Sequence, residues 1–337
     1  MKNDRVLLSH GAGGKKSSEL TERVFLKYFN DPALLELNDM AVLDLPRGRV
    51  SMSTDTFVVD PIFFPGGDIG SLAVHGTVND VAMAGALPIA VSAGFIIEEG
   101  LPFEDLDRIA SSMAYAATMA GVRIVTADTK VVPRGAADKL FINTTGVGVI
   151  PDGINVSGAR AREGDLVLLS GTIGDHGIAI ASAREGIAFK TTVESDSAPL
   201  NWMIAELISS LSQDIHVLRD PTRGGLATVL SEIAAQSSIG VRIREAGIPV
   251  RDAVKGACEL LGYDPLYLAN EGKIVAVVAP EAAERGLKIM KASKYGSDAC
   301  LIGEITADNP GKVILETVMG GNRLVDKLSG EMLPRIC

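Results

Sequence analysis

Aromatic residues and positive charge are both scarce in this sequence. Of its 337 residues 4% are aromatic, and the formal net charge is −10. A nucleic-acid groove needs aromatic side chains for base stacking and cationic side chains for the phosphate backbone. We therefore expect no nucleic acid as a partner. Nucleotides are not excluded, because ATP arrives with Mg²⁺ and carboxylates hold Mg²⁺.

Cysteine is scarce as well. The three cysteines, Cys258, Cys300 and Cys337, are odd in number and far apart, so the sequence predicts no disulfide framework. No C-x-x-C spacing occurs and the four histidines are scattered, which argues against a structural zinc site. Unpaired thiols of this kind fit the reducing cytoplasm best.

Long hydrophobic runs are also missing. The N-terminus holds an apolar run at residues 6–8, which is too short for the core of a signal peptide. The longest weakly polar stretch, 84–97, is interrupted by Pro88 and two glycines and is too short to span a bilayer. We therefore expect a cytoplasmic protein with no membrane partner.

The sequence is rich in glycine and in alternating helix and strand patterns. With 337 residues and 47% hydrophobic composition, it is long enough for two domains that each bury a core. The turn cluster at 151–153 marks the expected boundary between a domain over 1–150 and a domain over 151–330. Residues 331–337 lack a helical period and contain Pro334, so they predict an extended, mobile tail.

Hydrophobic periodicity predicts the individual elements. Ser17 or Ser18 can cap the first helix, and Pro102 and Gly121 can begin and end the third. Expected helices lie over 15–30, 71–86, 102–120, 174–185, 199–212, 226–236, 251–261 and 281–294. Expected strands lie over 50–59, 89–97, 122–127, 140–149, 165–170, 241–244 and 273–279. This mixture without a strict βαβ rhythm favours an α/β domain followed by an α+β domain over a Rossmann sheet.

A glycine-rich segment near the N-terminus, 10–17, is similar to a phosphate-binding loop. It contains Gly11, Gly13 and Gly14 followed by two lysines, but Ser9 stands where that motif needs glycine, and the required Ser or Thr is replaced by Lys16. Either the segment is a flap over phosphates or it is a disordered N-terminal arm.

Three aspartates of the first half stand among small or apolar residues. They are Asp55, Asp80 and Asp128, and a lone buried carboxylate is unfavourable. Each could cap a helix or stabilise a turn, whereas together they favour a Mg²⁺–nucleotide site. Lys130 follows Asp128 closely and could neutralise a transferring phosphoryl group, or it could be an ordinary surface lysine.

The second half carries three polar loops, 174–177, 220–225 and 270–272. Two glycines that open a helix after Arg223 would present free N–H groups to an anion, and Arg223 could add a bidentate contact. Glu271, between Asn270 and Gly272, is a candidate general base. Helix caps and tight turns are the structural alternative for all three loops.

The last residue, Cys337, is a candidate carrier of an acyl-type group. Extended, residues 331–337 would reach roughly 23 Å, enough to enter a cleft between domains. A prenylation signal is excluded because its cysteine lies fourth from the end. The alternative is an incidental terminal residue.

Together these segments resemble the HypE family of hydrogenase maturation carbamoyl dehydratases. That family belongs to the superfamily of aminoimidazole ribonucleotide synthetase and selenophosphate synthetase. The resemblance covers essentially the whole chain, from the glycine loop at 10–14 to the Pro-Arg-Ile-Cys ending, which is its most specific motif. It implies a two-domain PurM-like (AIR synthetase-like) fold, in which the N-terminal domains bind ATP and pair into a β-barrel-like homodimer core.

The resemblance also implies roles for individual residues. The implied Mg²⁺ ligands are Asp55, Asp80 and Asp128. The implied catalytic groups are Cys337, Lys130 and Glu271. Further ATP contacts are expected from Asn79, Asp80, Gly11, Gly13, Gly14, Thr222, Arg223 and Gly224.

The implied reaction is dehydration of a carbamoyl group on the Cys337 sulfur. A HypF-like carbamoyltransferase would load the thiol, and ATP would phosphorylate the carbamoyl oxygen so that phosphate leaves. Glu271 and Lys130 would handle the two N–H protons, giving a thiocyanate. A HypC–HypD-like iron scaffold would then receive the cyano group as a ligand for [NiFe]-hydrogenase.

Two other functions compete with this one. A superfamily kinase or synthetase acting on a free small molecule would not need the Cys337 tail. Selenophosphate synthetases usually carry a cysteine or selenocysteine near the glycine loop, whereas no cysteine precedes Cys258 here. A docking scaffold that binds metal through Cys337 would leave the carboxylates unexplained.

Overall fold

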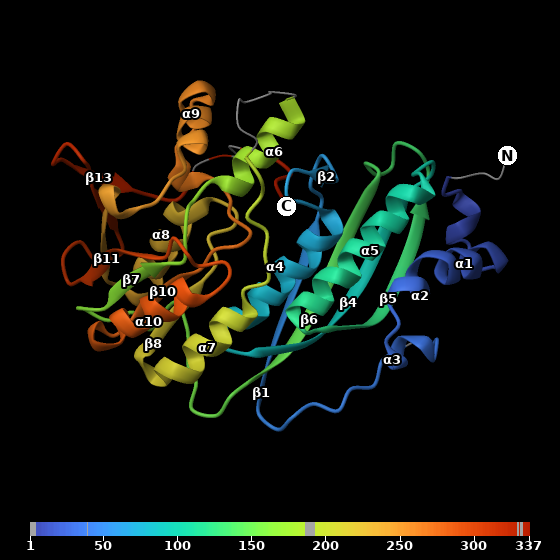
Figure 1. Cartoon of the computed structure of the whole chain (residues 1–337), viewed down its shortest axis with the longest axis horizontal. Coiled ribbons are helices and arrows are strands. Elements are labelled where there is room, and N and C mark those ends of the chain that lie inside the picture. The colour runs from blue at the N-terminus through green and yellow to red at the C-terminus, as the bar shows by residue number, and fades with distance from the viewer. Residues whose placement is uncertain (1–4, 39, 186–192, 329, 331–332) are drawn as a thin grey trace.

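The two halves of the chain form two separate β-sheets, which lie side by side along the long axis of the molecule (Figure 1). The computed structural model describes residues 5–38, 40–185, 193–328, 330 and 333–337. The first sheet has four strands in the order β1-β6-β4-β5, and the second has seven in the order β13-β12-β9-β11-β7-β10-β8. A small hairpin, β2 and β3, precedes helix α4.

The strands of the first sheet are long and those of the second are short. The first half contains β1 (Arg49–Phe57), β2 (Phe63–Phe64), β3 (Gly67–Asp68), β4 (Leu87–Glu98), β5 (Arg123–Val132) and β6 (Leu140–Ile150). The second half contains β7 (Leu166–Leu169), β8 (Ile215–Arg219), β9 (Gly240–Arg244), β10 (Val275–Val278), β11 (Cys300–Thr306), β12 (Val313–Glu316) and β13 (Asn322–Val325).

Helices cover both sheets. In the first half they are α1 (Lys15–Leu20), α2 (Leu26–Tyr28), α3 (Pro32–Leu35), α4 (Ile69–Met83) and α5 (Phe103–Ala120), with a π-helical turn (Thr21–Phe25) joining α1 to α2. In the second half they are α6 (Asp175–Glu185), α7 (Asn201–Leu211), α8 (Gly225–Ser237), α9 (Asp252–Leu261) and α10 (Pro280–Ala292). Among the described residues, none of these helices combines the length and apolar composition needed to cross a bilayer.

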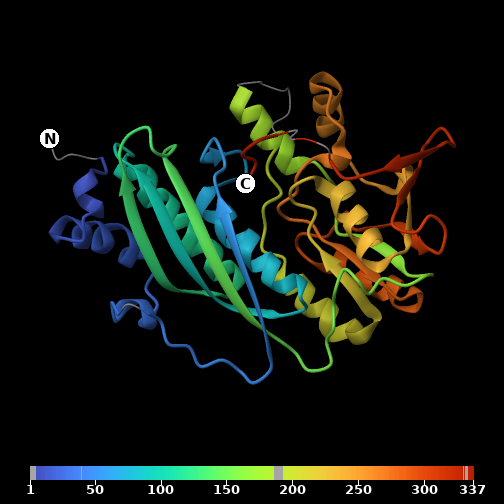
Figure 2. The same cartoon turned by 180° about the vertical axis from the view of Figure 1, so that it is seen from behind.

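Helices α4 and α5 lie on one face of the four-stranded sheet, and Figure 2 shows the opposite face without helices. Close packing depends on glycine in α4, since a Cβ at Gly70 would lie 2.5 Å from the carbonyl oxygen of Ile109 in α5. Alternation along β1 turns Phe57 into the core, while Val50 and Met52 point to the open face and are 53% and 69% exposed. One apolar face of this sheet is therefore left uncovered.

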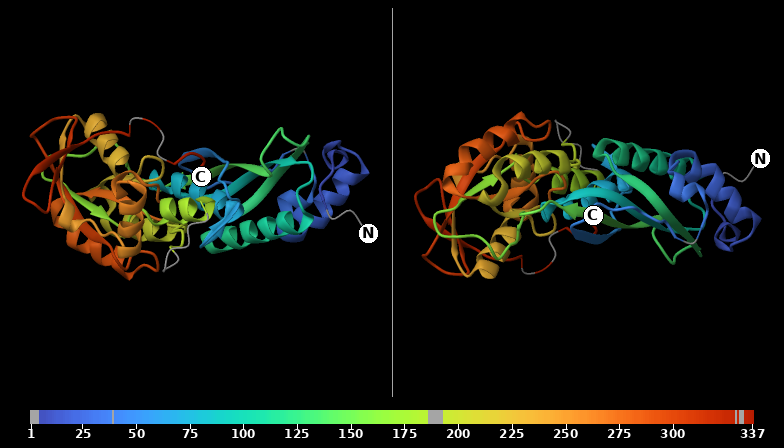
Figure 3. Two further views of the ribbon diagram at one scale, coloured as in Figure 1. Left: turned by 90° about the horizontal axis from the view of Figure 1, so that it is seen from above. Right: turned by 90° about the horizontal axis from the view of Figure 1, so that it is seen from below.

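The tail returns from the second half to the first. The C-terminus lies near the middle of the molecule (Figure 3). Ile336 is 6% exposed and belongs to the core of the first sheet, together with residues such as Phe57 and Val59. As predicted, residues 333–337 form neither helix nor strand.

All predicted helices and strands are present, with bounds that agree or are shifted by up to five residues. Two predicted caps are wrong. The first helix begins after Gly14, which has no side chain to cap with, and Ser17 instead accepts the Gly13 N–H at 2.8 Å. Pro102 is the residue before α5 because its ψ of 136° is extended, not helical. Helix α3 and strands β2, β3, β8 and β11–β13 were not predicted, since elements of a few residues carry no distinctive period.

We expect the Phe95→Ala change to lower the free energy of unfolding by about 3–5 kcal/mol. Phe95 is 2% exposed and packs against Phe25 and Phe29, with ring centroids 4.6 and 6.3 Å away, so its loss leaves a cavity under the N-terminal helices. Denaturant titration measures the change. Tyr115→Ala is the control, because Tyr115 is 68% exposed and its loss should change stability by less than about 0.5 kcal/mol.

Candidate functional site

The last residues of the chain are bound along the end of β1. The Val58 N–H donates to the main-chain oxygen of Cys337 at 3.0 Å, and the Arg335 Nε donates to the Val58 carbonyl oxygen at 2.8 Å. Arg335 also pairs with Asp138 at 2.6 Å. Arg184 in α6 donates to the carbonyl oxygens of Pro334 and Arg335 at 2.7 and 2.9 Å. The protein thus recognises the tail mainly through its backbone.

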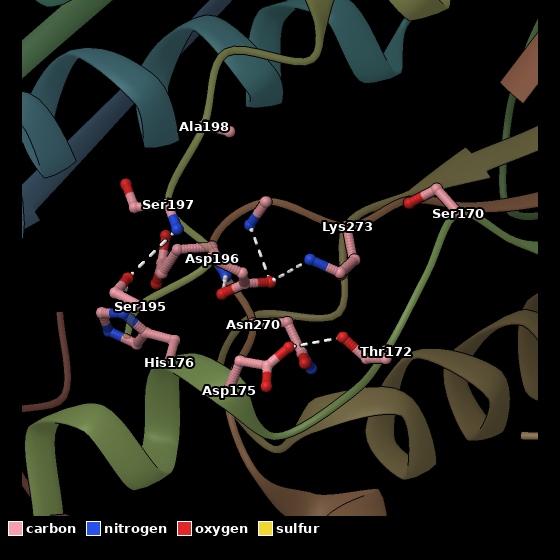
Figure 4. Close-up of polar contacts among 12 residues, drawn as sticks. Ser170, Thr172, Asp175, His176, Ser195, Asp196, Ser197, Ala198, Asn270 and Lys273 are labelled. Carbon is pink, nitrogen blue, oxygen red and sulfur yellow. Dashed lines mark hydrogen bonds and ion pairs between the residues drawn. The ribbon is translucent and has the colours of Figure 1, made fainter. Parts of the chain in front are cut away.

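His176 forms a further contact with the tail. Its Nε2 lies 2.8 Å from the Ile336 carbonyl oxygen. Its Nδ1 lies 2.8 Å from Ser195 Oγ, and Figure 4 shows these two residues side by side. A carbonyl oxygen only accepts, so Nε2 carries the proton in this contact. Complete burial lowers the pKa of His176, which keeps the imidazole neutral with Nδ1 free to accept from the serine hydroxyl.

These contacts place Cys337 in a cavity of about 440 Å³. The cavity is lined by Thr56 and Val58 of the first half, by Arg223 and Gly224 of the second, and by the tail itself. Burial raises the pKa of the Cys337 thiol far above its ordinary value; Glu271, Asp55 and Asp80 raise it further, and Arg223 opposes them. The resting thiol is therefore protonated.

Three carboxyl groups act on this thiol, those of Glu271, Asp55 and Asp80, and a fourth, Asp220, interacts with Asp80 and Asp55. Burial raises the pKa of each of them, and each except Asp55 is raised further by its acidic neighbours. For Asp220 the pKa reaches about 7. Glu271 is 4% exposed, and its Oε1 has no hydrogen-bond partner among the described residues. Acidic groups gathered in this way favour a cation in their midst.

This donor set fits Mg²⁺ with a nucleotide, because Mg²⁺ takes one or two carboxylates and completes its shell with water and phosphate oxygens. Asp80 is held by the Ser53 hydroxyl at 2.8 Å, and the neighbouring Asp55 carboxylate raises the pKa of Asp80. Within the part of the chain that the structure describes, no group of three or more His, Cys, Asp or Glu residues could hold a metal ion. The remaining ligands must therefore come from elsewhere.

Asp128 and Lys130 lie apart from this cluster. They belong to β5, the edge strand opposite to β1, and form an exposed ion pair at 3.0 Å. Asp128 aligns with Gly94 of β4, which aligns with Asn143 of β6 and then Thr56 of β1. Asp55 is one residue before Thr56 and so points to the other face of the sheet, toward Gly76 of α4. A single chain does not bring Lys130 to Glu271 or Asp128 to Asp55.

The N-terminal glycine loop lies beside β5. A Cβ at Gly11 would be 2.7 Å from the Val131 nitrogen, whereas Gly13 and Gly14 have open space around them. The loop therefore accompanies Asp128 and Lys130, away from Cys337. The predicted site residues therefore fall into two groups that lie apart in one chain. The glycine loop, Asp128 and Lys130 form one group, and the residues around Cys337 form the other.

The second loop group stays with Cys337. Thr222, Arg223 and Gly224 precede α8, where Gly224 has φ +77° and Gly225 has φ +61°. A Cβ at Gly225 would lie 2.5 Å from the Leu266 carbonyl oxygen, so glycine is required for the sharp entry into the helix. Asp220, the first residue of this loop, received no role from the sequence pattern, but its pKa is raised by Asp80 and Asp55, so it lies with the acidic groups of the site.

Asn79 has its amide occupied by the protein. Its side chain is 2% exposed, donates to the Ala198 carbonyl oxygen at 3.0 Å and accepts the Leu200 N–H at 2.8 Å. These bonds join α4 to the segment before α7. In this chain Asn79 positions the neighbouring Asp80 and connects the two halves.

Two family models match the chain. The AIR synthase related protein N-terminal domain matches residues 37–150, and the AIR synthase related protein C-terminal domain matches residues 162–316. Carbamoyl dehydratase HypE of Azotobacter vinelandii is 53% identical over 337 residues, which are 100% of this chain and 98% of that protein.

Two solved structures are similar over nearly the whole chain. The crystal structure of hydrogenase maturation protein HypE in complex with ATP matches with TM-score 0.95 and 53% identity, covering 98% of this chain and 99% of that one. The crystal structure of a HypE–HypF complex matches with TM-score 0.81 and 52% identity, covering 92% and 99%. These findings confirm the two-domain AIR synthetase-like fold.

We expect Asp220→Asn to weaken the pH dependence of stability in the ligand-free protein. A carboxyl whose folded pKa is about 7 binds its proton in the folded state and not in the unfolded state between about pH 4 and 7, so the wild type loses stability as pH rises through that window. Between pH 5 and pH 8 the wild type should lose on the order of 2 kcal/mol more than Asp220→Asn. Urea unfolding at both pH values measures this, and equal losses would contradict it.

Proposed function

The chain belongs to the carbamoyl dehydratase HypE family, and we propose that it performs this ATP-dependent step of hydrogenase maturation on the thiol of its own last residue, Cys337. The observation that carries the proposal is the bound tail, which places Cys337 among Glu271, Arg223, Asp55 and Asp80. A kinase for a free small molecule is not favoured, because relatives over the full length are named carbamoyl dehydratases.

The reaction removes the elements of water from a carbamoyl group bound to sulfur. The carbon–oxygen bond breaks, both N–H protons leave, and a carbon–nitrogen triple bond remains as a thiocyanate. ATP supplies the phosphoryl group with which the oxygen departs, giving ADP and phosphate. Glu271 accepts a proton from nitrogen as a general base. In the free site, burial and its acidic neighbours raise the pKa of Glu271 well above its ordinary value. Arg223 offsets negative charge beside the sulfur.

Asp55 and Asp80 would hold Mg²⁺ together with the phosphates of ATP. When bound, Mg²⁺ offsets negative charge on the transferring phosphoryl group. The same charge would lower the pKa values of the surrounding carboxyl groups, so that Glu271 becomes available as a base only in the loaded site. Thr222 and Gly224 would contact the nucleotide through the loop before α8.

A second copy of the chain completes the site in this proposal. Asp128, Lys130 and the glycine loop lie on the edge of the sheet away from Cys337, and the uncovered sheet face carries Val50, Met52 and Ile96. Two such faces packed against each other would bury these side chains, and a two-fold arrangement would place β5 of one copy near β1 of the other. The partner then supplies the metal ligand and the lysine that one chain lacks.

The tail alternates between this cavity and the surface. A HypF-like carbamoyltransferase loads the thiol outside, in keeping with the solved HypE–HypF complex of a relative. After dehydration the tail presents the cyano group to a HypC–HypD-like iron scaffold. A free thiol carrier needs reducing surroundings, and for this reason we assign the reaction to the cytoplasm.

Cys337→Ala should retain ATP binding and form no cyano product. The assay loads the protein with carbamoyl groups by cyanate treatment, adds ATP and Mg²⁺, and analyses the C-terminal peptide by mass spectrometry. In the wild type, the carbamoyl adduct should lose one water only when ATP is present. Cys258→Ala and Cys300→Ala are the matched controls and should behave as wild type. Loss of water from a peptide containing Cys258 or Cys300 would refute the carrier role.

Mixing two inactive variants should restore activity if the site is shared. A dimer of one Lys130→Ala chain and one Cys337→Ala chain contains one site with both an intact lysine and an intact thiol. After unfolding and refolding in equal amounts, the mixture should recover about a quarter of the wild-type turnover, since half of the dimers are mixed and half of their sites are complete. No recovery in a mixture shown to contain mixed dimers would place Lys130 and Cys337 of one chain in the same site.

A further inference from the structure

Glu271 lacks the usual means of fixing a catalytic side chain. Its Oε1 is buried without a hydrogen-bond partner among the described residues, so its direction depends on the backbone that carries it. That backbone is held on its N-terminal side by Asn270, whose amide donates to the Pro221 and Leu268 carbonyl oxygens at 2.9 and 3.0 Å. The Asn270 Oδ1 also accepts the Gly174 N–H at 2.7 Å.

The backbone N–H groups of Glu271 and of the residue after it are both held by one carboxylate. Asp196 accepts the N–H of Glu271 at 3.1 Å and that of Gly272 at 3.3 Å, and it forms an ion pair with Lys273 at 2.9 Å (Figure 4). The side chains of Lys273 and Asp196 are only 8% and 4% exposed. A Cβ at Gly272 would lie 1.7 Å from the Asp196 carbonyl oxygen, so the two segments touch backbone to backbone.

The same segment also contacts the tail and α4. Ser195, next to Asp196, bonds His176, whose other ring nitrogen bonds the Ile336 carbonyl oxygen. In the same segment, the Ala198 carbonyl oxygen accepts a hydrogen bond from the side-chain amide of Asn79. Residues 195–198 therefore set Glu271, Asp80 and the tail at fixed positions relative to one another.

We propose that Asp196 and Lys273 are positioning residues that hold Glu271 opposite the sulfur of Cys337. This inference rests on the proposed role of Glu271 and adds the pair that makes it effective. Asp196 orients the Glu271 backbone through two N–H bonds. The Lys273 ammonium neutralises the Asp196 carboxylate. This reduces the repulsion between Asp196 and the Glu271 carboxylate, which are both buried.

The pair also acts on Glu271 through charge. Asp196 raises the pKa of Glu271, as do Asp220, Asp55 and Asp80 from the surrounding elements, while the Lys273 ammonium offsets Asp196. Among the described residues, the other charged and titratable groups that interact with this place are Asp175, which acts on both Asp196 and Lys273, together with Arg223, His176 and the Cys337 thiol. Removing either member of the pair therefore shifts the titration of Glu271, and the two removals act in opposite directions.

The test is the single-turnover dehydration of the cyanate-loaded full-length protein, measured against pH and ATP concentration. Asp196→Asn and Lys273→Met should each slow the step about 10²-fold, as expected for a misplaced catalytic group, with the ATP concentration for half-maximal rate unchanged. The limb of the pH profile that reports Glu271 should move to lower pH in Asp196→Asn and to higher pH in Lys273→Met. In Lys273→Arg, which keeps the charge, the limb should stay in place.

Asp165→Asn is the matched control. Asp165 also accepts a backbone N–H, from Arg162 at 2.8 Å, and pairs with His216 at 2.7 Å, with side chains 4% and 5% exposed. This change should lower the melting temperature and leave the rate of the folded protein at the wild-type value. If Asp196→Asn does not fold, the positioning role is tested by the two lysine variants: the limb of the pH profile should move to higher pH in Lys273→Met and stay in place in Lys273→Arg.

Three results separate the possible failures. Wild-type rates in the folded variants would overturn the positioning role, and so would slow rates without opposite shifts of the pH profile. A wild-type rate in Glu271→Gln would instead overturn the proposed role of Glu271 itself. An inactive Glu271→Gln together with slow, oppositely shifted Asp196→Asn and Lys273→Met supports both.

Discussion

A partly buried thiol crowded by carboxyl groups is the constraint on which this structure depends. Cys337 lies among Glu271, Asp55 and Asp80, and the charge of Arg223 offsets them only in part. Burial favours the neutral forms of the thiol and of the three carboxyl groups, and like charge adds to this for all of them except Asp55, so the free site holds protons where a catalyst needs charge. A cation with its nucleotide reverses this preference. The site is therefore arranged to become reactive when it is loaded.

Such crowding is unfavourable for folding, and the architecture around it explains how it is tolerated. Each carboxyl comes from a different element: β1 for Asp55, α4 for Asp80, the loop after β8 for Asp220, and the loop before β10 for Glu271. Two large cores, one under each sheet, stabilise these elements independently. The segment before α7 then fixes them to one another through Asp196, Ser195 and Ala198. The residues that form the site are thus different from the core residues that stabilise the fold.

The tail is recognised by its backbone more than by its side chains. Arg184 and His176 bind the carbonyl oxygens of residues 334–336, and Val58 binds the main-chain oxygen of Cys337. Ile336 and Arg335 add one apolar and one ionic contact. Few side chains have to be desolvated when the tail enters, which suits a segment that must also leave. The thiol itself is used for none of these contacts and stays available for chemistry.

Much of this was predictable from the sequence, and the limits have a physical reason. Local patterns determined the helices, the long strands, the polar loops and the chemical character of Cys337 and Glu271, because periodicity and turn residues act over a few positions. Tertiary structure alone decided which of these meet. Strand alternation turns Asp55 and Asp128 to opposite faces, and strand order sets Lys130 and Cys337 at opposite edges. Asp196, Lys273 and Asp220 gained their roles only through contacts between distant segments, which no local pattern records.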